Sequence, residues 1–184
     1  MITIEEIEEN VEEWSDRDEI ETFLPEPIKS KYKQALHNRG EEVSIIKPKF
    51  IEKILSSFKE KLSETEVSLL TNYTQICVQK YEKGEYIKPH VANYEWQFLM
   101  VLTDSELDGI VIEDKTNETL VFHQDEIGNV LKIDRNTLHW VNPVRGDIRY
   151  SVVILEDSGK FYNDESPFVD PVAPSLNSEV GLIS

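Results

Sequence analysis

The apolar residues in the first third of the chain recur at helical spacing. Residues 3–6 (Thr-Ile-Glu-Glu) have the pattern of a capping box and predict a first helix. A second helix is predicted over about 26–38, after a charged break at 16–21. A third should begin after Pro48, where the apolar stripe is wide, and the capping-box residues 63–66 (Ser-Glu-Thr-Glu) should open a short fourth helix.

After residue 73 the period of the pattern changes to that of strands. Short runs rich in Val, Ile, Leu and aromatic residues are separated by turn residues, and they predict strands at 74–81, 97–103, 109–113, 119–123, 129–133, 138–142 and 148–155. Helices followed by many short strands predict one α+β domain, with the helices packed outside a β-sandwich or barrel.

The 184 residues are most simply one domain, since a chain of this length can bury roughly 70% of its unfolded surface. Within it we expect a mainly helical part over 1–72 and a β core over 73–156. The polar, proline-containing segment 157–184 is expected to be an irregular tail that could fold over the mouth of the barrel.

The net charge of −17 restricts the partners. Nucleic acids draw much of their affinity from Lys and Arg, and this acidic surface would repel them, as it would an acidic carrier protein or an anionic membrane. A small neutral or cationic molecule is the favoured substrate class. The acidity would equally serve to keep the protein soluble.

Other features favour a cytoplasmic protein. The single cysteine, Cys77, excludes an intrachain disulfide and fits a reducing compartment. The longest apolar run, 98–102, is far shorter than the ~20 residues that span a bilayer, and the acidic N-terminus is unlike a secretory signal.

Two histidines and an arginine in the β region suggest a metal site beside an anion. His90 and His139 each lie near a predicted strand end, and Arg149 follows ten residues after the second histidine. Imidazole is a common ligand of first-row metals, and a planar guanidinium suits a carboxylate. A lone histidine is more often a surface or core residue. The zinc patterns Cys-x-x-Cys and His-Glu-x-x-His are absent from the sequence.

The ordered combination over 74–155 resembles the iron(II)/2-oxoglutarate-dependent oxygenases, most closely the prolyl-hydroxylase-like branch. The residues that carry the resemblance are Tyr81-x-x-Gly84, His90, Asp108-Gly109, Gly128, His139-x-Val141-x-Pro143, Gly146 and Arg149-x-Ser151. The resemblance implies a double-stranded β-helix (a jelly-roll, cupin-like fold) in which His90 and His139 bind iron(II). It also implies that Arg149 binds the distal carboxylate of 2-oxoglutarate, with Ser151 and Tyr81 adding hydroxyl groups.

The chain departs from this family at Ala92. The family has His-x-Asp or His-x-Glu, which completes a set of two histidines and one carboxylate, whereas this chain has His90-Val91-Ala92. A methyl group cannot bind a metal, so one coordination position would be open. Relatives with Ala or Gly there are halogenases, which place a halide at that position, so chloride is an expected further ligand.

The sequence leaves three alternatives to the halogenase open. A nearby Asn93, Glu95 or Asp108 could replace the missing ligand. The site could have lost its chemistry, leaving a cupin-like binding module. The alanine could also be an introduced Asp-to-Ala change in a hydroxylase.

The expected function is oxidation of an aliphatic C–H bond in a small molecule, such as an amino acid or related metabolite, with O₂ and 2-oxoglutarate as co-substrates. Trp96, Gln97 and Asn142 are the expected substrate contacts, because aromatic faces and amides suit a pocket for a small polar molecule. Halogenation and hydroxylation both fit this expectation.

Overall fold

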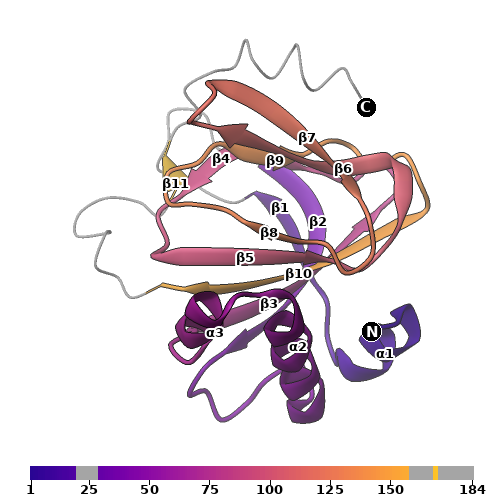
Figure 1. The fold of residues 1–184 in the computed structure, drawn as a ribbon. Helices are drawn as coiled ribbons and strands as arrows, with labels where there is room; N and C mark the ends of the chain where they lie inside the picture. Colours follow the sequence, from indigo (N-terminus) through magenta and orange to yellow (C-terminus); the bar gives the residue numbers. More distant parts are fainter. Residues whose placement is uncertain (20–28, 158–167, 170–184) are drawn as a thin grey trace.

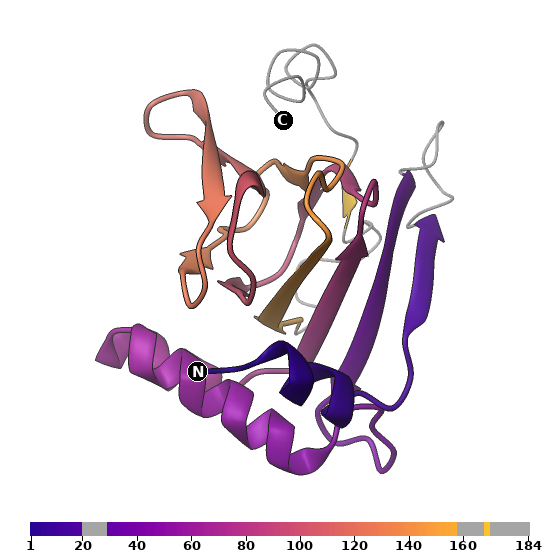
Figure 2. The same ribbon diagram turned by 90° about the vertical axis from the view of Figure 1, so that its right-hand side faces the viewer.

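The computed structural model describes residues 1–19, 29–157 and 168–169. Two antiparallel sheets are stacked on each other, and helices cover the outer face of one of them (Figures 1 and 2). The described elements are α1 (Ile4–Asn10), β1 (Ser15–Glu19), β2 (Lys29–Asn38), α2 (Pro48–Lys61), α3 (Glu64–Leu70), β3 (Gln75–Glu82), β4 (Ile87–Ala92), β5 (Trp96–Val101), β6 (Ser105–Asp114), β7 (Thr119–Asp125), β8 (Val130–Lys132), β9 (His139–Val141), β10 (Ile148–Glu156) and β11 (Phe168–Val169).

Three of the four predicted helices are confirmed, and both capping boxes form. The hydroxyl of Thr3 accepts from the backbone N–H of Glu6 at the start of α1, and Ser63 does the same for Glu66 at the start of α3. Helix α2 begins at Pro48, where the missing N–H costs nothing. No helix in the described part of the chain is long and apolar enough to cross a membrane.

The strand order is that of a double-stranded β-helix. One sheet has the order β1-β2-β3-β10-β5-β8 and the other has the order β11-β4-β9-β6-β7. Successive strands from β3 to β10 therefore alternate between the two sheets, except that β6 and β7 are neighbours in one sheet, and this closes a jelly roll around a shared interior. The chain is an α+β protein with this jelly roll at its centre, as the resemblance implied.

The predicted second helix is wrong over its described part, because residues 29–38 form the strand β2. Strand β2 pairs with β3 on one side and with β1 on the other, so neighbouring strands satisfy its backbone groups. Its side chains alternate in burial environment: Tyr32 packs in the barrel interior, whereas Ala35 packs beneath the helices. Residues 26–28 lie outside the described part of the chain.

The structure adds detail to the expected N-terminal part and tail. Besides its three helices, the part over 1–72 contributes β1 and β2 to the larger sheet. Most of the tail over 157–184 lies outside the described residues. Its two described residues, Phe168 and Val169, form the strand β11, which pairs with β4 so that Phe168 lies opposite Ala92.

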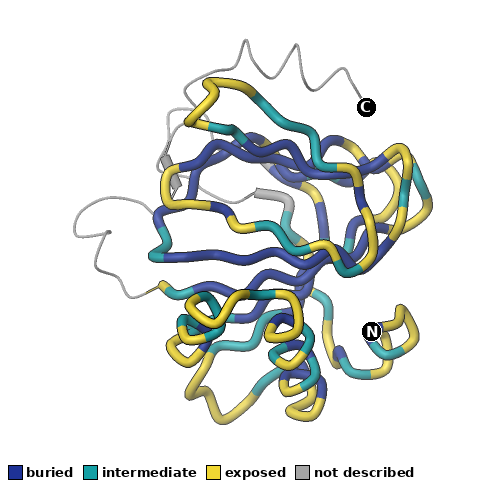
Figure 3. Tube along the Cα trace, in the orientation of Figure 1, coloured by how far each residue is buried: buried dark blue, intermediate teal, exposed yellow. Residues whose placement is uncertain are grey.

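The larger sheet has two differently packed faces. On β10, Tyr150, Val152 and Ile154 pack with the helices, whereas Val153 and Leu155 pack in the barrel interior. This is the period-2 alternation of a strand that is buried on both faces. Buried residues accordingly run along whole strands of both sheets (Figure 3). The residues of a candidate site must therefore come from the inward-facing positions.

Candidate functional site

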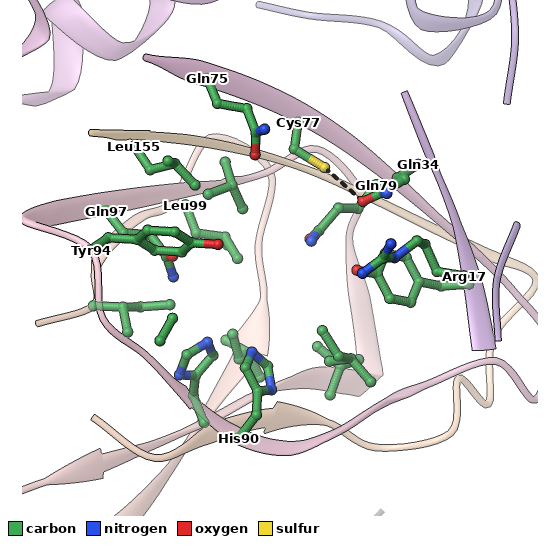
Figure 4. Close-up of a pocket in the computed structure, with 18 of the residues that line it drawn as sticks. Arg17, Gln34, Gln75, Cys77, Gln79, His90, Tyr94, Gln97, Leu99 and Leu155 are labelled. Carbon is green, nitrogen blue, oxygen red and sulfur yellow. Dashed lines mark hydrogen bonds between the residues drawn. The ribbon is translucent and has the colours of Figure 1, made fainter. Parts of the chain in front are cut away.

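A cavity of about 270 Å³ lies between the two sheets (Figure 4). This volume is slightly below the ~300–1,000 Å³ of typical small-molecule sites. The cavity is lined by Arg17, Tyr32, Gln34, Leu36, Gln75, Cys77, Gln79, Tyr81, Ile87, His90, Ala92, Tyr94, Gln97, Leu99, Ile110, Ile133, His139, Val141, Val153 and Leu155.

The structure brings His90 and His139 together in this cavity. The two residues lie directly opposite each other on β4 and β9, next to a register shift, and their ring centroids are 4.2 Å apart. His90 Nδ1 lies 2.7 Å from the carbonyl oxygen of Lys88, and His139 Nδ1 lies 2.8 Å from that of Thr137. A carbonyl only accepts, so Nδ1 carries the proton in both rings and Nε2 carries the lone pair that a metal requires.

Burial keeps both imidazoles neutral. It lowers the pKa of His90 to about 3, with a smaller effect from His139, while the hydrogen bond to Lys88 opposes the shift. Burial likewise lowers the pKa of His139 to about 4, against the hydrogen bond to Thr137. Neutral imidazoles held by backbone carbonyls are the form in which histidine binds first-row metals, so this pair fits two positions of an iron site.

Ala92 lines the same cavity and supplies no third ligand. Among the described residues, no group of three His, Cys, Asp or Glu side chains is arranged to hold a metal ion. Asn93, Glu95 and Asp108 are not among the lining residues. Asp108 is instead engaged with the backbone N–H groups of Arg145 and Gly146. A metal held here would have two protein ligands from the described residues.

Arg149 does not line the cavity. Its Nε and Nη2 atoms donate to the two carboxylate oxygens of Asp125, at 2.8 and 3.1 Å, and both side chains are almost fully buried. Nη1 lies 3.5 Å from the hydroxyl of Ser151, which itself donates to Gln79 at 3.0 Å. One edge of the guanidinium that the sequence assigns to 2-oxoglutarate is thus occupied by a carboxylate of the chain itself.

Of the remaining residues that were predicted to contact the substrate or the co-substrate, some line the cavity and others do not. Tyr81 and Gln97 line the cavity. Trp96 does not, because it precedes Gln97 on β5 and so faces the helices, where its indole donates to Glu156 at 2.8 Å. Asn142 also lies outside the lining, and its oxygen accepts from Trp140 at 3.0 Å.

The sequence interpretation missed the contribution of the N-terminal strands to the cavity. Arg17 lies in the segment that was predicted to be a charged break, and it pairs with Tyr32 across β1 and β2. Gln34 lies two residues further along β2, on the same side of the sheet. The alternation of Tyr32, Gln34 and Leu36 was the available signal, but the same segment also fits a helical period.

Comparison with known proteins supports the fold and goes no further. The chain matches no protein-family model and no curated protein. A prolyl-4-hydroxylase from Pseudomonas putida has a similar structure, at 12% identity over 69% of each chain with a TM-score of 0.51. An oxidoreductase of the 2OG-Fe(II) oxygenase family from Burkholderia pseudomallei matches at 13% identity over 78% of this chain and 72% of that one, with a TM-score of 0.53.

The likenesses to these two oxygenase structures show the fold. A cupin 2 conserved barrel domain protein from Rhodopseudomonas palustris is less similar, at 11% identity over 91% of this chain and 81% of that chain with a TM-score of 0.48. At such identities a shared jelly roll says nothing about which chemistry the barrel performs, so the function must be argued from the site.

Proposed function

We propose that this chain is an iron(II)- and 2-oxoglutarate-dependent enzyme that oxidises an aliphatic C–H bond of a small molecule. The observation that carries the proposal is the pair His90 and His139, whose Nδ1–H groups are held by backbone carbonyls inside a cavity of a double-stranded β-helix. Bound iron(II) would activate O₂ while 2-oxoglutarate is converted oxidatively to succinate and CO₂.

The residues of the chain would position the reactants. His90 and His139 would hold the metal at the floor of the cavity, and their carbonyl partners would fix the ring orientations. Apolar side chains such as Leu99, Ile110 and Val153 would exclude water around the target C–H bond. A substrate must be small, because the cavity of about 270 Å³ also has to hold the co-substrate.

Ala92 favours halogenation as the particular reaction. Its side chain is buried and lines the cavity beside the histidines, at the position where the family has a carboxylate. Chloride could occupy the coordination position that a methyl group leaves open. The alternative is hydroxylation, in which water or a further oxygen ligand fills that position.

Anaerobic spectroscopy tests the proposal. Iron(II) and 2-oxoglutarate added to the protein should give a visible metal-to-ligand charge-transfer band. His90→Ala and His139→Ala should each abolish the band. His37→Ala is the control, because His37 lies outside the cavity beside Ser44 and Tyr73. A wild-type protein without a band would refute the enzyme and favour a binding module. Iron binding that survives the loss of His139 would refute the assignment of the two histidines as ligands of one metal.

A second experiment separates the two reactions. In a halogenase, chloride and bromide should shift the charge-transfer band by different amounts, and Ala92→Asp should remove this halide response because a carboxylate would occupy the same position. In a hydroxylase, the wild-type protein should show no halide response, and Ala92→Asp should strengthen iron binding and increase hydroxylation. Mass spectrometry of products from a metabolite panel identifies the inserted atom.

A further inference from the structure

The charges around the cavity contrast with the charge of the protein as a whole. The chain has 36 acidic residues, yet no described residue of the cavity lining is Asp or Glu. The three acids that are buried in the described part, Glu85, Asp108 and Asp125, are all outside this lining. In the described part of the chain the acidic residues therefore lie outside the cavity lining, and the net charge of −17 is no guide to the charge of a ligand.

Arg17 is the one permanently charged residue in the described lining. The other lining groups that can ionise are neutral at pH 7, since burial lowers the pKa of both histidines and raises the pKa of Cys77 to about 12. Burial also raises the pKa of Tyr32 and Tyr94, and the positive charge of Arg17 opposes the rise in Tyr32, Cys77 and Tyr94 alike. The charge of Arg17 thus acts across the cavity.

The guanidinium of Arg17 is only partly satisfied by the protein. Its Nε is buried and has no hydrogen-bond partner within the described part of the chain. Such an orphaned donor is unusual, because buried polar groups are nearly always paired. Figure 4 shows the side chain of Arg17 directed into the cavity, on the side away from Tyr94. By contrast, Arg149 has a carboxylate partner and is absent from the lining.

Two glutamine side chains beside Arg17 present further hydrogen-bond donors. The oxygen of Gln34 accepts from the thiol of Cys77 at 3.5 Å, and the oxygen of Gln79 accepts from the hydroxyl of Ser151 at 3.0 Å. Each amide oxygen already accepts a hydrogen bond from the protein, and the NH₂ group of each side chain is a donor that a carboxylate could accept from. A fork-shaped cation next to two amide donors is complementary to a carboxylate.

We propose that Arg17 binds the carboxylate of a small organic acid in this cavity, with Gln34 and Gln79 as further donors. The ligand is therefore anionic, in place of the neutral or cationic molecule that the net charge favours. The carboxylate belongs either to 2-oxoglutarate, an assignment that rests on the proposed function, or to the molecule that is oxidised. Binding through Arg17 itself requires no metal.

The test follows the Nε–H resonance of Arg17 by ¹⁵N-edited NMR in metal-free protein. The signal is assigned by its absence from Arg17→Lys. Acetate, glutarate and 2-oxoglutarate are titrated at constant ionic strength, with acetamide and glutaramide as neutral counterparts. At least one acid should move the Arg17 signal saturably, and the amides should not. Arg17→Gln should weaken binding of that acid roughly 10- to 100-fold, the usual cost of losing a charged hydrogen bond.

Matched variants separate the outcomes. Arg145→Gln makes the same charge change at an exposed position and should leave the affinity unchanged. If Arg17→Gln binds 2-oxoglutarate more weakly, Arg17 is the residue that binds the co-substrate. If only Arg149→Met binds 2-oxoglutarate more weakly, Arg17 binds the carboxylate of the molecule that is oxidised. No saturable shift with any acid, or an equal shift with the amides, overturns the proposal. A missing charge-transfer band together with an intact Arg17 response would overturn the enzyme proposal alone.

Discussion

The buried pair of Arg149 and Asp125 allows a quantitative prediction about stability. The two side chains are 1% and 0% exposed, and two hydrogen bonds join them at 2.8 and 3.1 Å. Asp125→Val leaves a guanidinium that cannot lose its proton in a buried place. Removal of one partner of a buried ion pair typically costs ~3–5 kcal/mol. For a chain of this length that corresponds to a fall in Tm of roughly 6–20 °C.

The opposite single variant, Arg149→Met, should lower the free energy of unfolding by less than Asp125→Val does. Burial already raises the pKa of Asp125, and Arg149 is the charge that opposes this rise. Without Arg149 the carboxyl group of Asp125 can take up a proton and become neutral, whereas the guanidinium of Arg149 cannot become neutral when Asp125 is removed. The double variant Asp125→Val/Arg149→Met should recover most of the loss, because it removes both charges.

Urea denaturation of the four proteins, analysed as a double-mutant cycle, measures these differences in the free energy of unfolding. The expected order of stability is wild type close to the double variant, then Arg149→Met, then Asp125→Val. If the two single effects simply add in the double variant, the ion pair is not coupled. If Asp125→Val costs less than ~1 kcal/mol, the guanidinium is solvated rather than buried.

Two further predictions concern the metal-free protein. The pKa values of His90 and His139 are lowered to about 3 and 4, so the unfolded state binds more protons than the folded state below pH 6.5. Between pH 6.5 and 5, the free energy of unfolding of wild type should therefore fall by about 3 kcal/mol more than that of His90→Gln/His139→Gln, as measured by urea titration. Equal losses would contradict the buried neutral pair. Gly109→Ala should lower the free energy of unfolding by ~1–3 kcal/mol in the same assay, because the added Cβ would lie 2.2 Å from the carbonyl oxygen of His123 on the neighbouring strand. In the control Gly40→Ala the added Cβ meets no atom, so the loss of stability should be only the backbone cost of the positive φ at that position.

Local patterns in the sequence were sufficient for the parts of the fold that local interactions control. The capping boxes at Thr3 and Ser63 satisfy N–H groups within a few residues, and Pro48 sets the start of α2 by its own ring. The strands β3 and β5 to β10 were also predicted, from short apolar runs between turn residues. Strand β4 (Ile87–Ala92) was missed, because Lys88 and Pro89 interrupt the apolar pattern there. The pair of His90 and His139 was found through the ordered motif, and the structure places the two rings 4.2 Å apart.

Only the tertiary structure decided the features that depend on partners distant in sequence. Residues 29–38 fit a helical period, but hydrogen bonds from β3 make them a strand. The carboxylate that pairs with Arg149 belongs to Asp125, 24 residues earlier, and no local pattern relates the two residues. Arg17 had no informative neighbours in sequence, and it faces the cavity because β1 pairs with β2 in a register that sets Arg17 opposite Tyr32. Register and burial are collective properties of the sheet, so no single segment could specify them.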